Sequence, residues 1–252
     1  MKILDEILPL YEGKKPFVLA IVTGTKGSVP GHIGAKMVVK EDGKTSGTIG
    51  GGKVEKLVIE ESLNILKREG KPKALSFLLN EDNGYMCGGE MLIYLEAFGI
   101  TKHIVIFGAG HVGKALAYLG HFTGLTTIVV DDRPEFANKE QLPFADKIVL
   151  EDYIKSFDKL TFNDNSFIVI TTRDHEKDYI VTKKSLDTEA KYIGLIGSSS
   201  KKKRIFNMLK QDGFTEEKIQ RIHCPIGISI KSETPEEIAV SIIAEIIDIS
   251  KS

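Results

Sequence analysis

Three glycines in the segment His103–Arg133 have the spacing of a phosphate-binding turn. Gly108, Gly110 and Gly113 stand between a buried apolar run and a helical pattern, and in such a unit each glycine has a separate role. The first permits the tight turn, the second lets the backbone approach a pyrophosphate, and the third lets the helix pack closely on the strand. Free N–H groups at the helix start favour an anion. The segment therefore predicts half of a dinucleotide-binding βαβ unit.

Two acids end the second strand of this unit. Asp131 follows Gly113 by 18 residues, where an acidic side chain can accept hydrogen bonds from ribose hydroxyls, and Asp132 is next to it. His111 lies inside the turn, where its imidazole faces whatever occupies the anion site. That position suits a donor to a bound cofactor and equally suits simple packing at the helix start, so both interpretations stay open.

Polar side chains also follow two later strands. Arg173, Asp174 and His175 come directly after one of them, and the carboxyl ends of parallel strands are where open sheets bind ligands. After the next strand, a turn of small residues leads into a basic helix. The residues there that could either donate to a phosphate or cap the helix are Ser198, Ser199 and Lys201.

A second glycine-rich turn occurs in the first part of the chain. Gly50, Gly51 and Gly52 run directly into a helical pattern, so the same argument for an anion site applies. The alternative is that these glycines serve backbone geometry alone. His32 and Lys36, in the loop before this turn, are weaker candidates for a site.

The two cysteines differ in their surroundings. Cys87 lies between a polar loop and a strand, and the adjacent Gly88 would leave its sulfur accessible to a ligand or a soft metal. Cys224 follows His223, but one such pair without a CxxC companion is far short of a zinc site, so we expect a structural role for it. Cys87 is therefore the candidate functional thiol.

The apolar pattern predicts the elements that position these residues. Strands are expected at 17–22, 37–39, 74–79, 91–98, 104–107, 126–130, 147–150, 167–171 and 192–196, with a turn-rich loop from residue 23 to 36. Helices or helical turns are expected at 3–11, 53–68, 111–122, 152–160, 175–187, 199–211 and 215–221. A last helix begins at Thr234 as N-cap, with Pro235 at its first position and Glu237 completing a capping box.

The order of these elements predicts an α/β protein of two domains. Residues 1–99 mix helices and strands in a smaller α+β domain, and residues 100–252 alternate strands and helices. Such alternation predicts a Rossmann-like parallel sheet with right-handed crossovers. The joint is expected between Gly99 and Lys102, since a fresh strand–turn–helix pattern begins there.

The composition excludes several classes of protein. The net charge of −1 over 252 residues gives no reason to expect nucleic acid or an anionic membrane surface as a partner. No apolar stretch is long enough to span a bilayer, and the N-terminal segment lacks the features of a signal peptide. With two cysteines there is no disulfide framework, and a reducing cytoplasm is the simplest location.

Taken together, the motifs resemble one family, the XdhC and CoxI proteins, which are accessory factors of xanthine and carbon monoxide dehydrogenases. The matching stretches occur in order along nearly the whole chain. They are GSVPGHIGAKM (27–37), GTIGGGKVE (47–55), CGG (87–89), FGAGHVGKALA (107–117), VVDDRPEFA (129–137), TRDH (172–175), YIGLIGS (192–198) and HCPIGISI followed by TPEEIAVSIIAEI. Two arginines frequent in the family are replaced, by Gly31 and within Ser199–Ser200, which removes potential anion contacts.

The resemblance implies a cytoplasmic maturation factor for molybdenum hydroxylases. Such a protein binds molybdenum cofactor (molybdopterin), supports its sulfuration by a cysteine desulfurase, and inserts it into the apo form of a xanthine-dehydrogenase-like enzyme, here as a chaperone rather than an enzyme. Cys87 would contact the molybdenum. The expected site is a cleft between the domains, with Gly50–Gly52 and Cys87 on one side and Gly110, His111 and Arg173–His175 on the other. A homodimer would suit a dimeric client.

Two other functions compete with this one. An NAD(P)-dependent oxidoreductase would use the GAGHVG fingerprint (108–113) for hydride chemistry and would bind NAD(P) in the Rossmann half. A nucleotide-binding redox regulator would need a DNA-binding segment, and the sequence has no basic recognition helix to supply one. An assay of molybdenum, pterin and nucleotide in the purified protein separates these possibilities.

Overall fold

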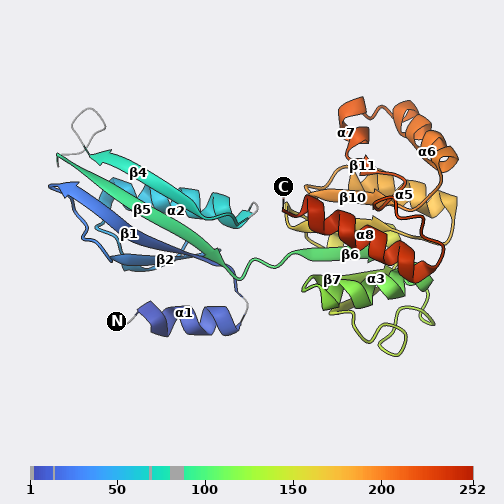
Figure 1. The fold of residues 1–252 in the computed structure, drawn as a ribbon, viewed down its shortest axis with the longest axis horizontal. Helices are drawn as coiled ribbons and strands as arrows, with labels where there is room; N and C mark the ends of the chain where they lie inside the picture. Colours follow the sequence, from blue (N-terminus) through green and yellow to red (C-terminus); the bar gives the residue numbers. More distant parts are fainter. Residues whose placement is uncertain (1–2, 14, 68–69, 80–87, 252) are drawn as a thin grey trace. The chain divides into compact units, whose positions relative to one another are not determined.

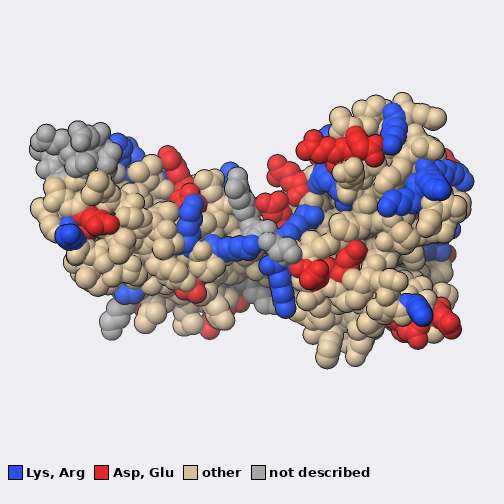
Figure 2. Space-filling model, turned by 45° about the horizontal axis from the view of Figure 1, so that its top comes forward, with Lys and Arg blue, Asp and Glu red and all other residues tan. Residues whose placement is uncertain are grey.

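A computed structural model describes residues 3–13, 15–67, 70–79 and 88–251. The chain divides into two compact units, residues 1–100 and 101–252. Basic and acidic side chains are interspersed on the face of each unit shown in Figure 2. Within the described ranges, no helix is both long and apolar enough to cross a membrane.

The first unit is a five-stranded antiparallel sheet with the strand order β3–β2–β1–β5–β4 (Figure 1). The strands are β1 (Phe17–Gly27), β2 (Lys36–Lys40), β3 (Thr45–Thr48), β4 (Lys73–Leu79) and β5 (Gly89–Phe98). Helix α2 (Gly52–Lys67) buries Val54, Val58 and Ile65 against one face, where they join the apolar core of this unit. Helix α1 (Ile3–Glu12) lies against β2 and β3, where its Glu6 accepts a hydrogen bond from Lys40 at 3.1 Å.

The second unit is a six-stranded parallel sheet with the strand order β11–β10–β9–β6–β7–β8. The strands are β6 (His103–Phe107), β7 (Thr126–Asp131), β8 (Lys147–Leu150), β9 (Ser166–Ile170), β10 (Tyr192–Leu195) and β11 (Ile222–His223). The order reverses between β6 and β9, and open α/β sheets bind ligands in the crevice at such a switch point. The central strands β6, β9 and β10 are almost wholly buried, as expected of a parallel sheet covered on both faces.

Helices cover both faces of this sheet and form two apolar cores (Figure 1). One face is packed by α3 (His111–Phe122) and α8 (Pro235–Ile249). The other face is packed by α4 (Tyr153–Ser156), a 3-10 turn (Phe157–Lys159), α5 (His175–Ser185), α6 (Ser199–Gln211) and α7 (Glu216–Gln220). The capping box predicted for the last helix is present, because Thr234 accepts from the Glu237 N–H and Glu237 accepts from the Thr234 N–H.

The predicted α/β class is confirmed, and three details of the prediction are wrong. Residues 23–27 are not loop but the second half of β1, which pairs with β5 as far as Gly89. Backbone hydrogen bonds form this pairing, so the polar, glycine-containing sequence does not prevent it. The short strands β3 and β11 were not predicted, because β3 contains no apolar residue and β11 has only two residues.

Candidate functional site

The glycine turn between β6 and α3 is fixed by two of its glycines and left open by the third. Gly108 has φ +114°, and a Cβ there would lie 2.3 Å from the carbonyl oxygen of Thr171 at the end of β9. A Cβ at Gly113 would lie 1.9 Å from the Gly108 carbonyl oxygen. At Gly110 a Cβ would meet no atom within 4 Å. Gly108 and Gly113 are thus required by the tight turn and close packing that the sequence predicts, and Gly110 presents bare backbone.

Helix α3 begins without a capping side chain. Gly110 is its N-cap and has no side chain to accept a hydrogen bond, and the first turn contains no acid. Peptide dipoles leave partial positive charge at such a helix start. His111 is exposed there and lines a mostly apolar pocket of about 550 Å³ together with side chains such as Tyr118, Phe144 and Val240. An anionic group with an attached ring system would meet compatible chemistry at this end of the helix.

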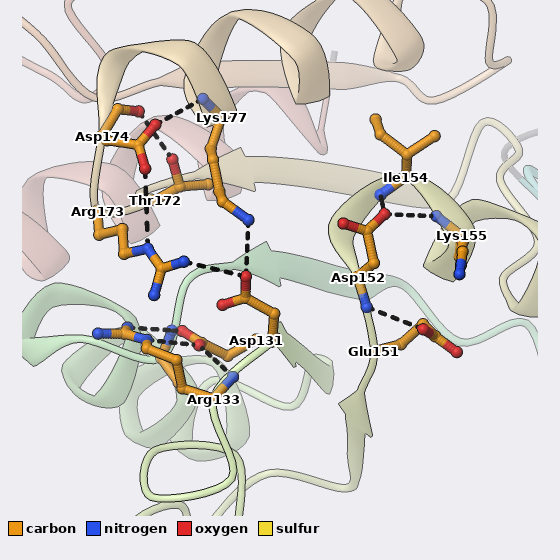
Figure 3. Close-up of polar contacts among 12 residues, drawn as sticks. Asp131, Arg133, Glu151, Asp152, Ile154, Lys155, Thr172, Arg173, Asp174 and Lys177 are labelled. Atoms are coloured by element: carbon orange, nitrogen blue, oxygen red, sulfur yellow. Dashed lines mark hydrogen bonds and ion pairs between the residues drawn. The ribbon is translucent and has the colours of Figure 1, made fainter.

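Asp131, at the end of β7, is fully buried and accepts four hydrogen bonds (Figure 3). One comes from the Ala109 N–H in the glycine turn at 2.8 Å, and three come from Arg133, through its backbone N–H at 3.1 Å and its Nε and Nη2 at 2.9 Å each. Burial by itself would raise the pKa of Asp131, but the hydrogen bonds from Arg133 and Ala109 hold it below its ordinary value. The expected ribose contact of Asp131 stays a prediction, and it would require Arg133 to move.

Asp132, the residue after β7, forms ion pairs with two basic side chains that follow β9. Its Oδ2 lies 2.6 Å from Lys177 Nζ in α5 and 3.2 Å from Arg173 Nη2, just after β9. Asp174 caps α5 by accepting from the Lys177 N–H at 2.8 Å. Figure 3 shows the guanidinium groups of Arg133 and Arg173 on the same side of Asp131. Arg133 follows β7 and Arg173 follows β9, the strands on either side of β6, so two arginines face one region beside the glycine turn.

Tyr153 lies beneath this cluster with its hydroxyl buried. The residue is 2% exposed, and the part of the chain that the structure describes offers its hydroxyl no hydrogen-bond partner. Burial, followed by the negative charges of Asp131 and Asp132, raises the pKa of Tyr153 well above its ordinary value. Asp132 Oδ1 is also buried without a partner among these residues. The phenol therefore stays protonated beside the two carboxylates.

After β10, the polar side chains of Ser198 and Lys201 form hydrogen bonds with other groups of the chain. Ser198 is the N-cap of α6 and accepts from the Lys201 N–H at 3.3 Å, which is the capping alternative of the sequence prediction. The Lys201 ammonium pairs with the buried carboxylate of Asp178 and donates to the Ile196 carbonyl at 2.8 Å. Burial raises the pKa of Asp178. Ser199 and His175 are exposed, and His175 and Ser198 line a pocket of about 210 Å³.

The glycine turn of the first unit is filled by an internal carboxylate. Gly50, Gly51 and Gly52 have φ angles of +126°, +86° and +68°, so all three adopt backbone that favours glycine. Glu55 Oε1 accepts from the Gly51 N–H at 2.9 Å, from the Ile49 N–H at 3.0 Å and from the Thr48 hydroxyl at 2.6 Å. Burial would raise the pKa of Glu55, but these hydrogen bonds lower it. A carboxylate of the chain itself therefore occupies these N–H groups, and the expected cofactor contact of Gly50–Gly52 stays a prediction.

The two cysteines and the remaining candidates are placed as follows. Cys87 lies outside the described residues, and Gly88 beside it is exposed. Cys224 is buried, and burial raises the pKa of its thiol, in keeping with a structural role. Lys36 donates to the Gly34 carbonyl oxygen at 2.9 Å, and His32 is exposed. The described ranges contain no group of three or more His, Cys, Asp or Glu side chains placed to hold a metal ion.

Sequence reasoning brought together some of the residues at the carboxyl edge of the second unit and missed others. Gly108, Gly110, His111, Asp131 and Arg173 all lie at this edge. The residues it missed are Arg133, Tyr153, Lys177 and, in the first unit, Glu55. Two of these had a local signal: an arginine two residues after the fingerprint acid, and an acid in the first turn of α2. Tyr153 and Lys177 lie in α4 and α5, and they approach the acids at the end of β7 only in the folded protein. No local sequence pattern therefore predicts them.

Known proteins resemble this chain along its whole length. It is 34% identical over 257 aligned residues to YqeB, an uncharacterized protein of Escherichia coli strain K12. That alignment covers 100% of this chain and 47% of YqeB. It is 30% identical over 159 residues to a probable xanthine dehydrogenase subunit of Bacillus subtilis strain 168, covering 63% of this chain and 46% of that protein. The chain thus spans about half the length of these relatives.

A solved structure shares the fold. The crystal structure of a xanthine dehydrogenase from Bacillus halodurans superimposes with a TM-score of 0.56 at 21% identity, covering 100% of this chain and 96% of that one. At that identity the likeness concerns the fold alone.

Two family descriptions match the two units separately. Residues 10–77 match the XdhC and CoxI family, and residues 104–246 match the XdhC Rossmann domain. The second match covers the glycine turn, the acids after β7 and the residues after β9. The resemblance read from the sequence motifs is thereby confirmed, and the chain belongs to the XdhC family.

Proposed function

We propose that this protein is an accessory factor that binds molybdenum cofactor, supports its sulfuration and inserts it into a molybdenum hydroxylase of the xanthine dehydrogenase type. Family membership supports the link to that enzyme, as does the description of the Bacillus subtilis relative as a probable xanthine dehydrogenase subunit. The observation that carries the proposal is the open start of α3, where bare backbone at Gly110 meets a helix N-terminus without a capping acid.

The residues at this edge fit a phosphate-bearing cofactor. The start of α3 and the Arg173 guanidinium, whose side chain is 43% exposed, would hold a phosphate through charge-assisted hydrogen bonds. The pocket that begins at His111 offers apolar surface to a ring. When bound, the cofactor supplies the molybdenum whose terminal sulfido ligand the hydroxylase needs.

Cys87 is the proposed contact to molybdenum, because a soft thiolate suits that metal. Sulfur would come from a cysteine desulfurase and the mature cofactor would pass to the apo-hydroxylase. A homodimer and a cytoplasmic location belong to the same proposal.

The test is to express the protein in a host that makes molybdenum cofactor and to assay the purified protein for molybdenum and pterin. We expect both to copurify with the wild type. Cys87→Ala should lower activation of the client hydroxylase by at least about tenfold, since even outer-sphere residues of metal sites contribute that much. Cys224→Ala is the matched control, because it removes a thiol that is buried.

Two results would contradict the proposal. One is a wild-type protein that carries neither molybdenum nor pterin under these conditions. The other is a Cys87→Ala variant that keeps the cofactor and activates the client fully.

A further inference from the structure

The acid that ends the second strand of a dinucleotide-binding fold accepts hydrogen bonds from the ribose hydroxyls. In this chain that position is Asp131, at the carboxyl end of β7 and directly beside the glycine turn, as its hydrogen bond from the Ala109 N–H shows. Whether the turn can bind a dinucleotide therefore depends on whether the Asp131 carboxylate is accessible to a ribose.

Both oxygens of Asp131 are already occupied. Oδ1 accepts from the N–H and Nε of Arg133, and Oδ2 accepts from Arg133 Nη2 and the Ala109 N–H. An ionised carboxylate offers about four acceptor sites. These four hydrogen bonds therefore leave no acceptor site of Asp131 for the two hydroxyls of a ribose. The residue is 0% exposed, which removes the approach as well as the acceptor sites.

Arg133 is held in this position by more than one contact. Its guanidinium makes a two-point pair with Asp131, which is the strong geometry for arginine and carboxylate. A face of the guanidinium also stacks on Phe136, with Arg133 Cζ 3.9 Å from the ring centroid. The Arg133 side chain is 22% exposed. A ribose would have to displace an anchored cation and leave a buried carboxylate without its counterion.

The neighbouring acid offers no substitute. Asp132 Oδ2 binds both Lys177 and Arg173, and its Oδ1 is buried. A ligand at this edge therefore meets two arginines where a dinucleotide fold presents a free carboxylate. Such an edge suits a phosphate group and disfavours a ribose diol.

We propose that Arg133 is a specificity-determining residue that closes the ribose subsite of the Rossmann unit. The glycine turn consequently takes a phosphate-bearing ligand without a ribose diol contact, and NAD is excluded. The identity of that ligand rests on the proposed function, whereas the exclusion of NAD does not.

The test is a titration of the purified protein with NAD+ by calorimetry. Wild type, Arg133→Ala and Arg133→Gln are compared, and Lys184→Ala, which removes an exposed positive charge at the far end of α5, is the control. We expect the arginine variants to bind NAD+ at least about tenfold more tightly than wild type, because two hydroxyls gain an acceptor. The control should match wild type. If Arg133→Ala unfolds, Arg133→Gln carries the comparison, because its amide can donate to at most one of the two Asp131 oxygens that the guanidinium occupies and leaves the other acceptor free.

Three outcomes would overturn the inference. In the first, wild type binds NAD+ as tightly as the arginine variants do. In the second, wild type and the arginine variants all fail to bind NAD+. In both cases Arg133 is not the residue that excludes the ribose. Wild type could also bind NADP+ tightly and lose that binding in the variants, which would assign Arg133 to a 2′-phosphate. Cofactor content and client activation are separate readouts, so failure here is distinguishable from failure of the proposed function.

Discussion

The two glycine-rich turns that open helices in this protein differ in how their N–H groups are satisfied. In the turn before α2, Glu55 accepts from the Gly51 and Ile49 N–H groups, so the anion at the helix start belongs to the chain itself. In the turn before α3, Asp131 accepts from the Ala109 N–H, but no side chain caps the helix and its first turn contains no acid. The first turn is closed and the second is open.

This difference refines what a glycine-rich turn predicts. Both turns have the glycines and the following helix, and both therefore have the partial positive charge that attracts an anion. What separates them is the fourth residue of the helix, which is Glu55 in α2 and Lys114 in α3. A glycine-rich helix start indicates an external anion only where the first turn of that helix does not supply a carboxylate of its own.

The largest expected effect concerns the geometry of the open turn. In Gly113→Ala the new Cβ would lie 1.9 Å from the Gly108 carbonyl oxygen, so the helix must move away from the strand. We expect the free energy of unfolding of the second unit to fall by about 1–3 kcal/mol or more. Hydrogen exchange of a peptide covering β6 and α3, measured by mass spectrometry, reports the loss in this unit.

Gly110→Ala is the matched control for that substitution. Its Cβ would meet no atom within 4 Å and its φ of −69° suits alanine, so stability should stay near that of wild type. The added methyl would instead hinder backbone approach and lower the affinity for a phosphate-bearing ligand. Equal destabilisation by the two substitutions would show that the roles assigned to these glycines are wrong.

A smaller effect is expected when the closed turn loses its charge. Glu55→Gln keeps an acceptor oxygen but removes the negative charge from three hydrogen bonds, and we expect the free energy of unfolding of the first unit to fall by about 1 kcal/mol. Glu41→Gln, at an exposed position, is the control. Urea unfolding of both variants and wild type measures the difference.

The same residue predicts a pH dependence. The folded-state pKa of Glu55 lies below its ordinary value of 4.5, so the unfolded state binds the proton more tightly. Its stabilising contribution is therefore present above pH 4.5 and is lost as the pH falls through the folded-state pKa. Wild type and Glu55→Gln should converge in stability at acid pH, and a constant difference would contradict this assignment.

The smallest effect should follow from closing the open turn. Lys114→Glu places an acid at the position in α3 that Glu55 occupies in α2, and Lys114→Gln controls for the loss of the lysine. We expect the acid to lower affinity for a phosphate-bearing probe such as pyrophosphate by roughly two- to fivefold, because a charge near a helix start contributes about 0.3–1 kcal/mol. Unchanged affinity in a calorimetric titration would mean that the start of α3 is not where the anion binds.

Much of the fold could be predicted because it depends on local patterns. The buried strands of the second unit read as continuous apolar runs, and the start of α8 was recognisable from Thr234, Pro235 and Glu237 alone. Residues 23–27 were misjudged because a polar, glycine-containing segment reads as loop unless its pairing partner is known. Strand pairing is a property of two segments, so neither of them carries the whole signal.

In the candidate site, too, some features could be predicted from local spacing and others could not. Gly108 and Gly113 were assigned correctly from spacing, since a tight turn and close helix packing admit glycine alone. The occupancy of each charged group could not be predicted in this way. Arg133 lies only two residues from Asp131, but the meeting of Arg173 and Lys177 on Asp132 depends on which strand ends share one edge of the sheet.

The amino-acid sequence by itself determined the family, the alternation that produces a parallel sheet, and the glycines without which the turn before α3 cannot form. Those features depend on residue size and on hydrophobic period, which act over a few neighbouring residues. Only the tertiary structure decided that Arg173 and Lys177 from one part of the chain meet the carboxylate of Asp132 from another. Charge pairing depends on distance in space, and residues far apart in the chain set that distance.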